Sequence, residues 1–206
     1  MDHESWLIVV KSKHFVYRVE AERPWTPEKI LELLEGCYQE YYEMMGTGLK
    51  TFIEVEDRLC PSEKLSAILS GGKVICEFPK EFGKIQNAWE LAYHFFAHEV
   101  FHLWVGGYTI SHGEVIEALT QYMADRTLAK LGWIDNNRLT DSLKKRRISN
   151  TSIDRYYIRF YDLEAEKGEA ILYKLCRELA ECYRAIFPTD ESADVTPILN
   201  RYLGDI

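Results

Sequence analysis

The sequence predicts an α+β protein, with a small mixed sheet and one helix over residues 1–87 and a helical half over residues 88–206. Short runs rich in Val, Ile and aromatic residues lie in the first half, as is typical of strands. Apolar residues recur at helical spacing through most of the second half. The chain contains no internal repeat, low-complexity tract or Gly/Ser-rich linker, so we expect a single compact domain over residues 1–206.

In the first half, four strands are predicted at the runs Trp6–Val10, His14–Glu20, Lys50–Val55 and Lys73–Phe78. A helix is predicted from about Glu28 to Met45, because apolar residues recur there every three or four positions. Gly46 ends this helix. Four strands and one helix are enough for a small sheet covered on one face.

In the second half, helical periodicity and the breaks at Gly132 and Pro188 predict six helices. Their expected ranges are 88–104, 114–131, 138–147, 152–163, 167–187 and 195–203. The first of these contains the most informative feature of the chain, the motif His98-Glu99-Val100-Phe101-His102.

This H-E-x-x-H motif predicts a zinc site. In a helix, His98 and His102 are one turn apart and lie on the same face, so their imidazoles can bind one zinc ion. Glu99 would then lie beside a metal-activated water as its general base. The alternative is a core helix whose two histidines hydrogen-bond other groups. His94 lies on the same stripe, but one straight helix spreads three histidines over about 12 Å, so we expect it to be a neighbouring or core residue.

A catalytic zinc ion takes three protein ligands and keeps one position for water. Glu114 and Glu117 open the next predicted helix and lie three residues apart, so either carboxylate can supply the third ligand. Both can equally be solvated surface acids, which is the commonest fate of Glu on a helix.

The run from His98 to Trp104, followed by Glu117-Ala118-Leu119-Thr120-Gln121-Tyr122, resembles the gluzincin zinc metallopeptidases, in particular the M1 and M61 aminopeptidase groups. The resemblance implies a thermolysin-like catalytic domain, with Zn²⁺ held by His98, His102 and Glu117. It further implies that the motif helix lies beneath the sheet and that substrate binds between the two halves. The resemblance is sharp over residues 94–126 and weak elsewhere.

The sequence departs from the family's pattern at three places. The gap of fourteen residues between His102 and Glu117 is shorter than is usual in the M1 group. The family anchors the substrate's amine through a Glu in a G-x-M-E-N strand, which is absent; Glu77, in a predicted edge strand over 70–77, is the nearest counterpart. The family also places a catalytic Tyr in a Tyr-x-Lys-Gly string, where this chain has Ala165-Glu166-Lys167-Gly168. The resemblance therefore leaves Tyr161, Tyr157 or His112 as candidates to stabilise the oxyanion.

These observations predict a zinc-dependent peptidase that acts on a peptide or protein substrate, and the resemblance implies an aminopeptidase-like enzyme. The alternative is a catalytically impaired gluzincin-fold domain that serves as a binding or scaffold module, which Ala165 favours and the intact Glu99 opposes. A plain helical interaction domain, which would bind no metal, is a third interpretation.

The composition and charge of the chain limit the kinds of partner and the cellular compartment that we expect for it. The net charge of −8 argues against nucleic acid as a partner. The basic run Lys144–Arg147 is short and reads as a solvated face, or as a contact for an acidic partner. Five scattered cysteines without a C-x-x-C pair predict core thiols and no disulfide framework. The acidic start Met1–Ser5 and the short apolar run after it predict no signal peptide and no membrane span. We therefore expect a cytoplasmic protein, or an exported one if the chain is an excised domain.

Overall fold

The computed structural model describes residues 7–49, 52–60, 65–70, 72–106, 112–186 and 194–204. Its contacts divide the chain into two compact units. Unit 1 comprises Met1–Gln39 and Leu49–Leu103, and unit 2 comprises Glu40–Gly48 and Trp104–Ile206. The sheet-bearing unit thus extends beyond residue 87 and includes the motif helix as far as Leu103. The expectation of a single domain stays a prediction.

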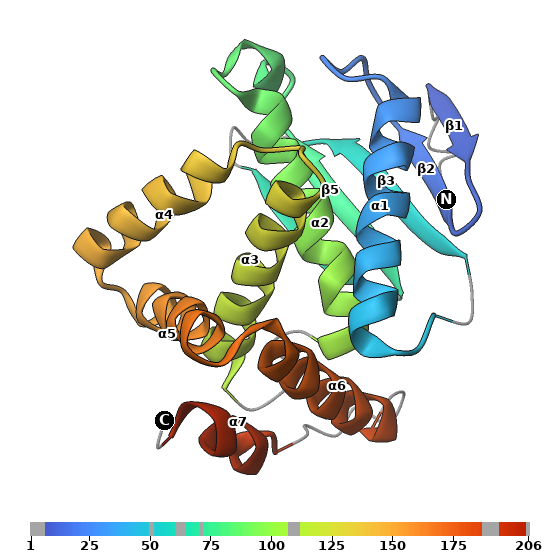
Figure 1. Ribbon diagram of the computed structural model, residues 1–206. Helices are drawn as coiled ribbons and strands as arrows, with labels where there is room; N and C mark the ends of the chain where they lie inside the picture. Colours follow the sequence, from blue (N-terminus) through green and yellow to red (C-terminus); the bar gives the residue numbers. More distant parts are fainter. Residues whose placement is uncertain are drawn as a thin grey trace. The chain divides into compact units, whose positions relative to one another are not determined.

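Unit 1 is built on a five-stranded mixed sheet with the strand order β1-β2-β3-β5-β4 (Figure 1). The central strands β2, β3 and β5 are parallel, while the edge strands β1 and β4 are antiparallel to their neighbours. The strands are β1 (Ile8–Lys11), β2 (Phe15–Val19), β3 (Ile53–Leu59), β4 (Ser66–Ser70) and β5 (Lys73–Phe78). The α+β class is confirmed, and a strand is present in each of the four predicted runs, of which Trp6 and residues 50–51 lie outside the described residues. The sequence analysis did not predict β4.

The second edge strand corrects one expectation about the sheet. The run 70–77 was expected to form an edge strand, but β5 lies inside the sheet, between β3 and β4. Glu77 accepts a hydrogen bond from Ser66 Oγ at 2.6 Å, across to the true edge strand. The residues that a ligand could reach along this edge therefore belong to β4.

The described residues form seven α-helices and one short 3₁₀ turn, Phe82–Lys84. The helices are α1 (Pro27–Met45), α2 (Ala88–Val105), α3 (Gly113–Lys130), α4 (Asn136–Ser149), α5 (Ser152–Lys167), α6 (Glu169–Ile186) and α7 (Thr196–Leu203). Every predicted helix is present, and most ends shift by one to four residues. None of the described helices combines the length and apolarity that crossing a membrane requires.

Aromatic packing holds α2 against one face of the sheet in unit 1. The Phe96 ring lies 5.8 Å from the Tyr17 ring, 5.8 Å from the Phe78 ring and 6.5 Å from the Trp25 ring, centroid to centroid. The pairs with Tyr17 and Trp25 are edge to face, and such pairs each stabilise by about 0.5–1.5 kcal/mol beyond their area burial. The implied position of the motif helix on the sheet is therefore observed within this unit.

A buried polar network lies beside these rings. The fully buried Asp57 accepts hydrogen bonds from Tyr17 Oη at 2.8 Å and from Arg23 Nε at 2.7 Å. The Trp25 Nε1–H donates to Tyr17 Oη at 3.1 Å. Every member has a partner, so the network joins β2 and β3 to the segment before α1. Burial nevertheless raises the pKa of Asp57, because it outweighs the hydrogen bonds from Arg23 and Tyr17.

In unit 2, α5 packs against α3, α4 and α6. The Tyr122 and Tyr157 rings meet edge to face at 5.2 Å, between α3 and α5. α7 lies against its neighbours through Tyr202, which donates to Glu178 of α6 at 2.7 Å, and through Arg159, which donates to the Leu203 carbonyl. Burial and the Glu178 partner raise the pKa of Tyr202 to about 12, so its hydroxyl stays a donor at neutral pH.

Glu35 provides a stability test for unit 1. Its carboxylate accepts from Ser12 Oγ at 2.6 Å, from the His14 amide at 2.7 Å and from His14 Nδ1 at 2.6 Å. Burial alone would raise the pKa of Glu35, but these hydrogen bonds outweigh it and lower the pKa. Glu35→Gln should reduce the free energy of unfolding by about 2 kcal/mol at pH 7.

Because the folded-state pKa is lowered, this contribution is present above the unfolded-state pKa and is lost as the pH falls through the folded-state value. Denaturant unfolding at several pH values measures it, with the exposed Glu32→Gln on the same helix as control. A wild-type advantage that persists at low pH would contradict the assignment.

Candidate metal centre

The three polar residues of the motif lie in α2 and are nearly buried. His98 is 5% exposed, Glu99 is 6% exposed and His102 is 6% exposed. The helix forms here because the segment contains no Gly or Pro and its apolar residues pack on the sheet. Burying two imidazoles and a carboxylate in so apolar a helix is costly unless they serve each other or an ion.

The two imidazoles face one another. His98 Nε2 lies 3.0 Å from His102 Nε2, and the ring planes are inclined by 77°. Two nitrogens bound to one tetrahedral zinc ion at about 2.0–2.1 Å lie about 3.3 Å apart. The observed separation is close to this value, so the pair fits a shared metal ion. Without one, a single N–H···N hydrogen bond joins the rings.

The motif's carboxylate lies at the same place. Glu99 Oε1 is 3.8 Å from His98 Nε2. At this distance the carboxylate is too far for a strong hydrogen bond to that nitrogen, but near enough to a ligand bound beside the histidines to exchange a proton with it. Unit 1 thus brings together His98, Glu99 and His102, as the sequence predicts.

Two further side chains of unit 1 lie near the motif. Burial raises the pKa of the Cys76 thiol well above its usual value, and the charges of Glu99 and Asp57 add to the rise. Cys76 therefore stays protonated at neutral pH, in keeping with a core thiol. The His94 ring lies 5.9 Å from the His98 ring, one turn earlier in the helix and partly exposed.

Glu117 lies in the second turn of α3, in unit 2, and is partly exposed. Its Oε1 accepts a hydrogen bond from Gln121 Nε2 at 2.9 Å. Gln121 is four residues further along, so this i,i+4 pair restricts the carboxylate's orientation. The sequence interpretation missed this role of Gln121, although its spacing from Glu117 would have revealed it. Glu114 is exposed on the first turn.

His112 begins α3. Its backbone is left-handed, with φ 63°, and its imidazole Nε2 lies 2.8 Å from Thr196 Oγ1 of α7. The Thr196 hydroxyl donates its hydrogen to Asp194 Oδ1 at 2.5 Å, so it accepts from His112. This assigns the hydrogen to His112 Nε2.

Tyr157 is fully buried in α5, and its hydroxyl donates to Asp125 Oδ2 of α3 at 2.7 Å. Burial and the Asp125 charge raise its pKa far above the usual tyrosine value. Arg146 lies over the ring at 4.0 Å. The hydroxyl is therefore committed to an interaction between two helices.

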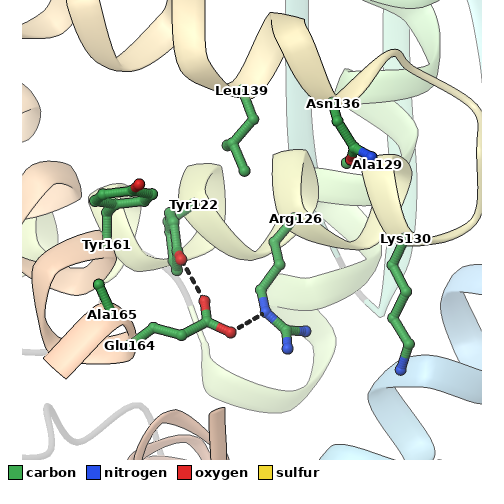
Figure 2. Close-up of a pocket in the computed structure, with 9 residues that line it drawn as sticks. All are labelled: Tyr122, Arg126, Ala129, Lys130, Asn136, Leu139, Tyr161, Glu164 and Ala165. Carbon is green, nitrogen blue, oxygen red and sulfur yellow. Dashed lines mark hydrogen bonds and ion pairs between the residues drawn. The ribbon is translucent and has the colours of Figure 1, made fainter. Parts of the chain in front are cut away.

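Tyr161 and Ala165 line a cavity of about 390 Å³ between α3, α4 and α5 (Figure 2). The other lining residues are Tyr122, Arg126, Ala129, Lys130, Asn136, Leu139 and Glu164. Arg126 Nε donates to Glu164 Oε1 at 2.8 Å, and Tyr122 donates to the other oxygen of that carboxylate, as Figure 2 shows.

The cavity lies on a particular face of α3. At about 100° per residue, Arg126 projects about 180° away from Glu117 around the helix axis. Tyr161 and Ala165 therefore face the side of α3 opposite to Glu117. The bonds from Arg126 and Tyr122 to Glu164 hold the last turn of α5 against α3.

No protein-family model and no curated protein matches the chain. The structure is similar to solved structures of M1 zinc metallopeptidases. One, from Deinococcus radiodurans, is 13% identical with a TM-score of 0.55. A mutant from the same organism, bound to a Tyr-Ser-Ala substrate, is 13% identical with a TM-score of 0.56. A mutant of a two-domain M1 enzyme, bound to L-tryptophan, is 14% identical with a TM-score of 0.57.

Each alignment covers 97% of this chain and 48% of the other chain. The chain thus spans about half the length of the enzymes that it matches. At this level of identity the similarity shows the fold alone. The fold is like that of M1 zinc metallopeptidases, in agreement with the resemblance of the sequence to the gluzincins.

The facing imidazoles give the first test of a metal centre. His102→Ala should weaken zinc binding by more than about 100-fold, because even substitutions beside metal ligands cost 10–100-fold. Leu91→Ala, an exposed position two turns before His98 on the same helix, should leave the affinity unchanged. Competition with a chromophoric chelator measures both constants. Equal affinities for the wild type and His102→Ala would contradict a metal site at the motif.

Proposed function

We propose that this protein is a zinc-dependent peptidase. The observation that carries the proposal is the 3.0 Å approach of His98 Nε2 and His102 Nε2, with Glu99 beside them, in a nearly buried part of α2. This is the arrangement that the motif predicts for zinc, and it occurs in a fold like that of M1 zinc metallopeptidases.

His98, His102 and Glu117 are our proposed zinc ligands. Two imidazoles and one carboxylate form a donor set that could hold a metal ion. They leave one of four positions for water or substrate, as catalytic zinc sites do. Gln121 supports the choice of Glu117, because it orients that carboxylate in the way that outer hydrogen bonds orient metal ligands.

When bound, zinc would supply a Lewis acid that polarises the scissile carbonyl and acidifies water. Glu99 accepts the proton of the attacking water and then delivers it to the leaving amine. The same carboxylate can serve both steps because it lies beside the ligand position and is nearly excluded from bulk water.

A peptide substrate fits the edge of the sheet in unit 1. β4 ends the sheet, so its outer side offers backbone N–H and C=O groups to an extended chain. Ile68 on this strand is 53% exposed and offers an apolar contact. Two of the M1 neighbours hold a Tyr-Ser-Ala substrate and L-tryptophan, which agrees with a peptide substrate here.

The oxyanion donor stays a prediction. The Tyr157 hydroxyl and the His112 Nε2–H already donate to Asp125 and Thr196, so either would have to exchange that partner for the substrate. Tyr161 lines the cavity on the face of α3 opposite to Glu117. Loss of one such donor costs about 100-fold or more in turnover. We therefore expect slower turnover than in an enzyme with a tyrosine at position 165.

The third ligand is tested by a matched pair of variants. Glu117→Gln should weaken zinc binding by more than about 100-fold, because it removes the anionic ligand. Glu114→Gln, one turn earlier on α3 and exposed, should bind zinc like the wild type. Chelator competition reports both affinities. If Glu114→Gln loses zinc and Glu117→Gln keeps it, the assignment of the third ligand is wrong.

The base is tested by Glu99→Gln. This variant should retain one zinc ion per chain and lose peptide hydrolysis by about 100-fold or more, because general base catalysis contributes 10²–10⁴-fold. Metal analysis and digestion of a peptide library, followed by mass spectrometry, give the two readouts. Unchanged hydrolysis would remove Glu99 from the mechanism. A wild-type protein that binds zinc but cleaves no peptide would instead indicate a binding module.

A further inference from the structure

The start of α3 is anchored in an unusual way. A residue at this position commonly caps the helix through its side chain, but the His112 side chain makes no capping hydrogen bond. Its carbonyl accepts the first helical bonds, from the Val115 amide at 2.9 Å and the Ile116 amide at 3.2 Å. The imidazole reaches across 84 residues of sequence to Thr196 instead.

The backbone of His112 supports a specific role for this contact. A φ of 63° is uncommon for a residue other than glycine and costs free energy that the surrounding structure must offset. The hydrogen bond to Thr196 holds the imidazole while the backbone keeps the left-handed conformation. It thereby fixes the residue from which α3 starts.

Thr196 is itself firmly placed. Its amide and its hydroxyl both donate to Asp194 Oδ1, at 3.0 Å and 2.5 Å. The rest of α7 is held by the buried Leu199 and Leu203 and by the hydrogen bond from Tyr202 to Glu178. The acceptor for His112 is thus part of a packed helix.

We propose that His112 is a positioning residue, through which Thr196 of α7 sets the position of Glu117 and hence the affinity for zinc. This inference rests on the proposed function, because it takes Glu117 as the third ligand. Glu117 lies five residues after His112 in the same rigid helix. A shift or rotation at the first turn therefore moves its carboxylate directly, and ligand geometry tolerates only small displacements.

The hydrogen assigned to His112 Nε2 distinguishes this positioning role from a direct contact between His112 and the metal centre. Because the Nε2–H is used on Thr196, His112 acts on the metal centre through the backbone of α3. The C-terminal helix then becomes a structural support of the metal centre, although no residue of α7 is a proposed ligand.

The test compares Thr196→Val with Thr196→Ser in the full chain. Valine keeps the shape and removes the hydroxyl, while serine keeps the hydroxyl. Thr196→Val should weaken zinc binding about tenfold, the lower end of the loss seen when an outer partner of a metal site is removed. Thr196→Ser should retain the wild-type affinity. Chelator competition is measured at a temperature where circular dichroism shows each variant to be folded.

A second variant makes the result specific for the His112–Thr196 pair. His112→Gly tolerates the left-handed backbone and lacks the imidazole, so it should weaken zinc binding as Thr196→Val does. The double variant should lose no more than either single one, because both changes remove the same hydrogen bond. Additive losses, or wild-type affinity in Thr196→Val, would overturn the inference. Absence of zinc binding in the wild type would overturn the proposed function itself.

Discussion

The rest of the structure depends on one constraint, the approach of two imidazole nitrogens to 3.0 Å in a nearly buried helix. Two nitrogen lone pairs at this distance require a proton or a cation between them. The helix can hold them there because Phe96, on its other side, packs among the rings of the sheet. The motif is therefore held in place by α2, which packs on the sheet beside the buried Asp57 network.

Contacts within unit 2 fix α3, the helix that carries the proposed third ligand, Glu117. α3 is fixed at two levels along its length. His112 holds its start, and over residues 122–126 Asp125 accepts from Tyr157 while Tyr122 and Arg126 donate to Glu164. Within α3, the hydrogen bond from Gln121 restrains the Glu117 carboxylate. A carboxylate restrained in this way loses little conformational entropy on binding an ion.

Much of this could be predicted from sequence, for identifiable reasons. The motif helix and α3 carry strong local signals, namely helical periodicity, Gly breaks and the spacing of His98, His102 and Glu117. Strand β4 could not be predicted, because Ser66–Ser70 contains only one β-branched residue and forms a strand by pairing with β5. The partner of His112 could not be predicted either, because it lies 84 residues away and only the packing of α7 brings it there. Likewise, local patterns end α5 at 163, whereas the bonds of Glu164 to α3 accompany a helix that continues to Lys167.

The central claim is that the motif binds one zinc ion, with Glu117 as the proposed third ligand, and anomalous diffraction from crystals grown with zinc tests it most directly. The account predicts one strong peak per chain, at about 2.0–2.2 Å from His98 Nε2, His102 Nε2 and a carboxylate oxygen of Glu117. A map with no peak at the motif, or a peak bound by the two histidines while Glu117 points elsewhere, would contradict it.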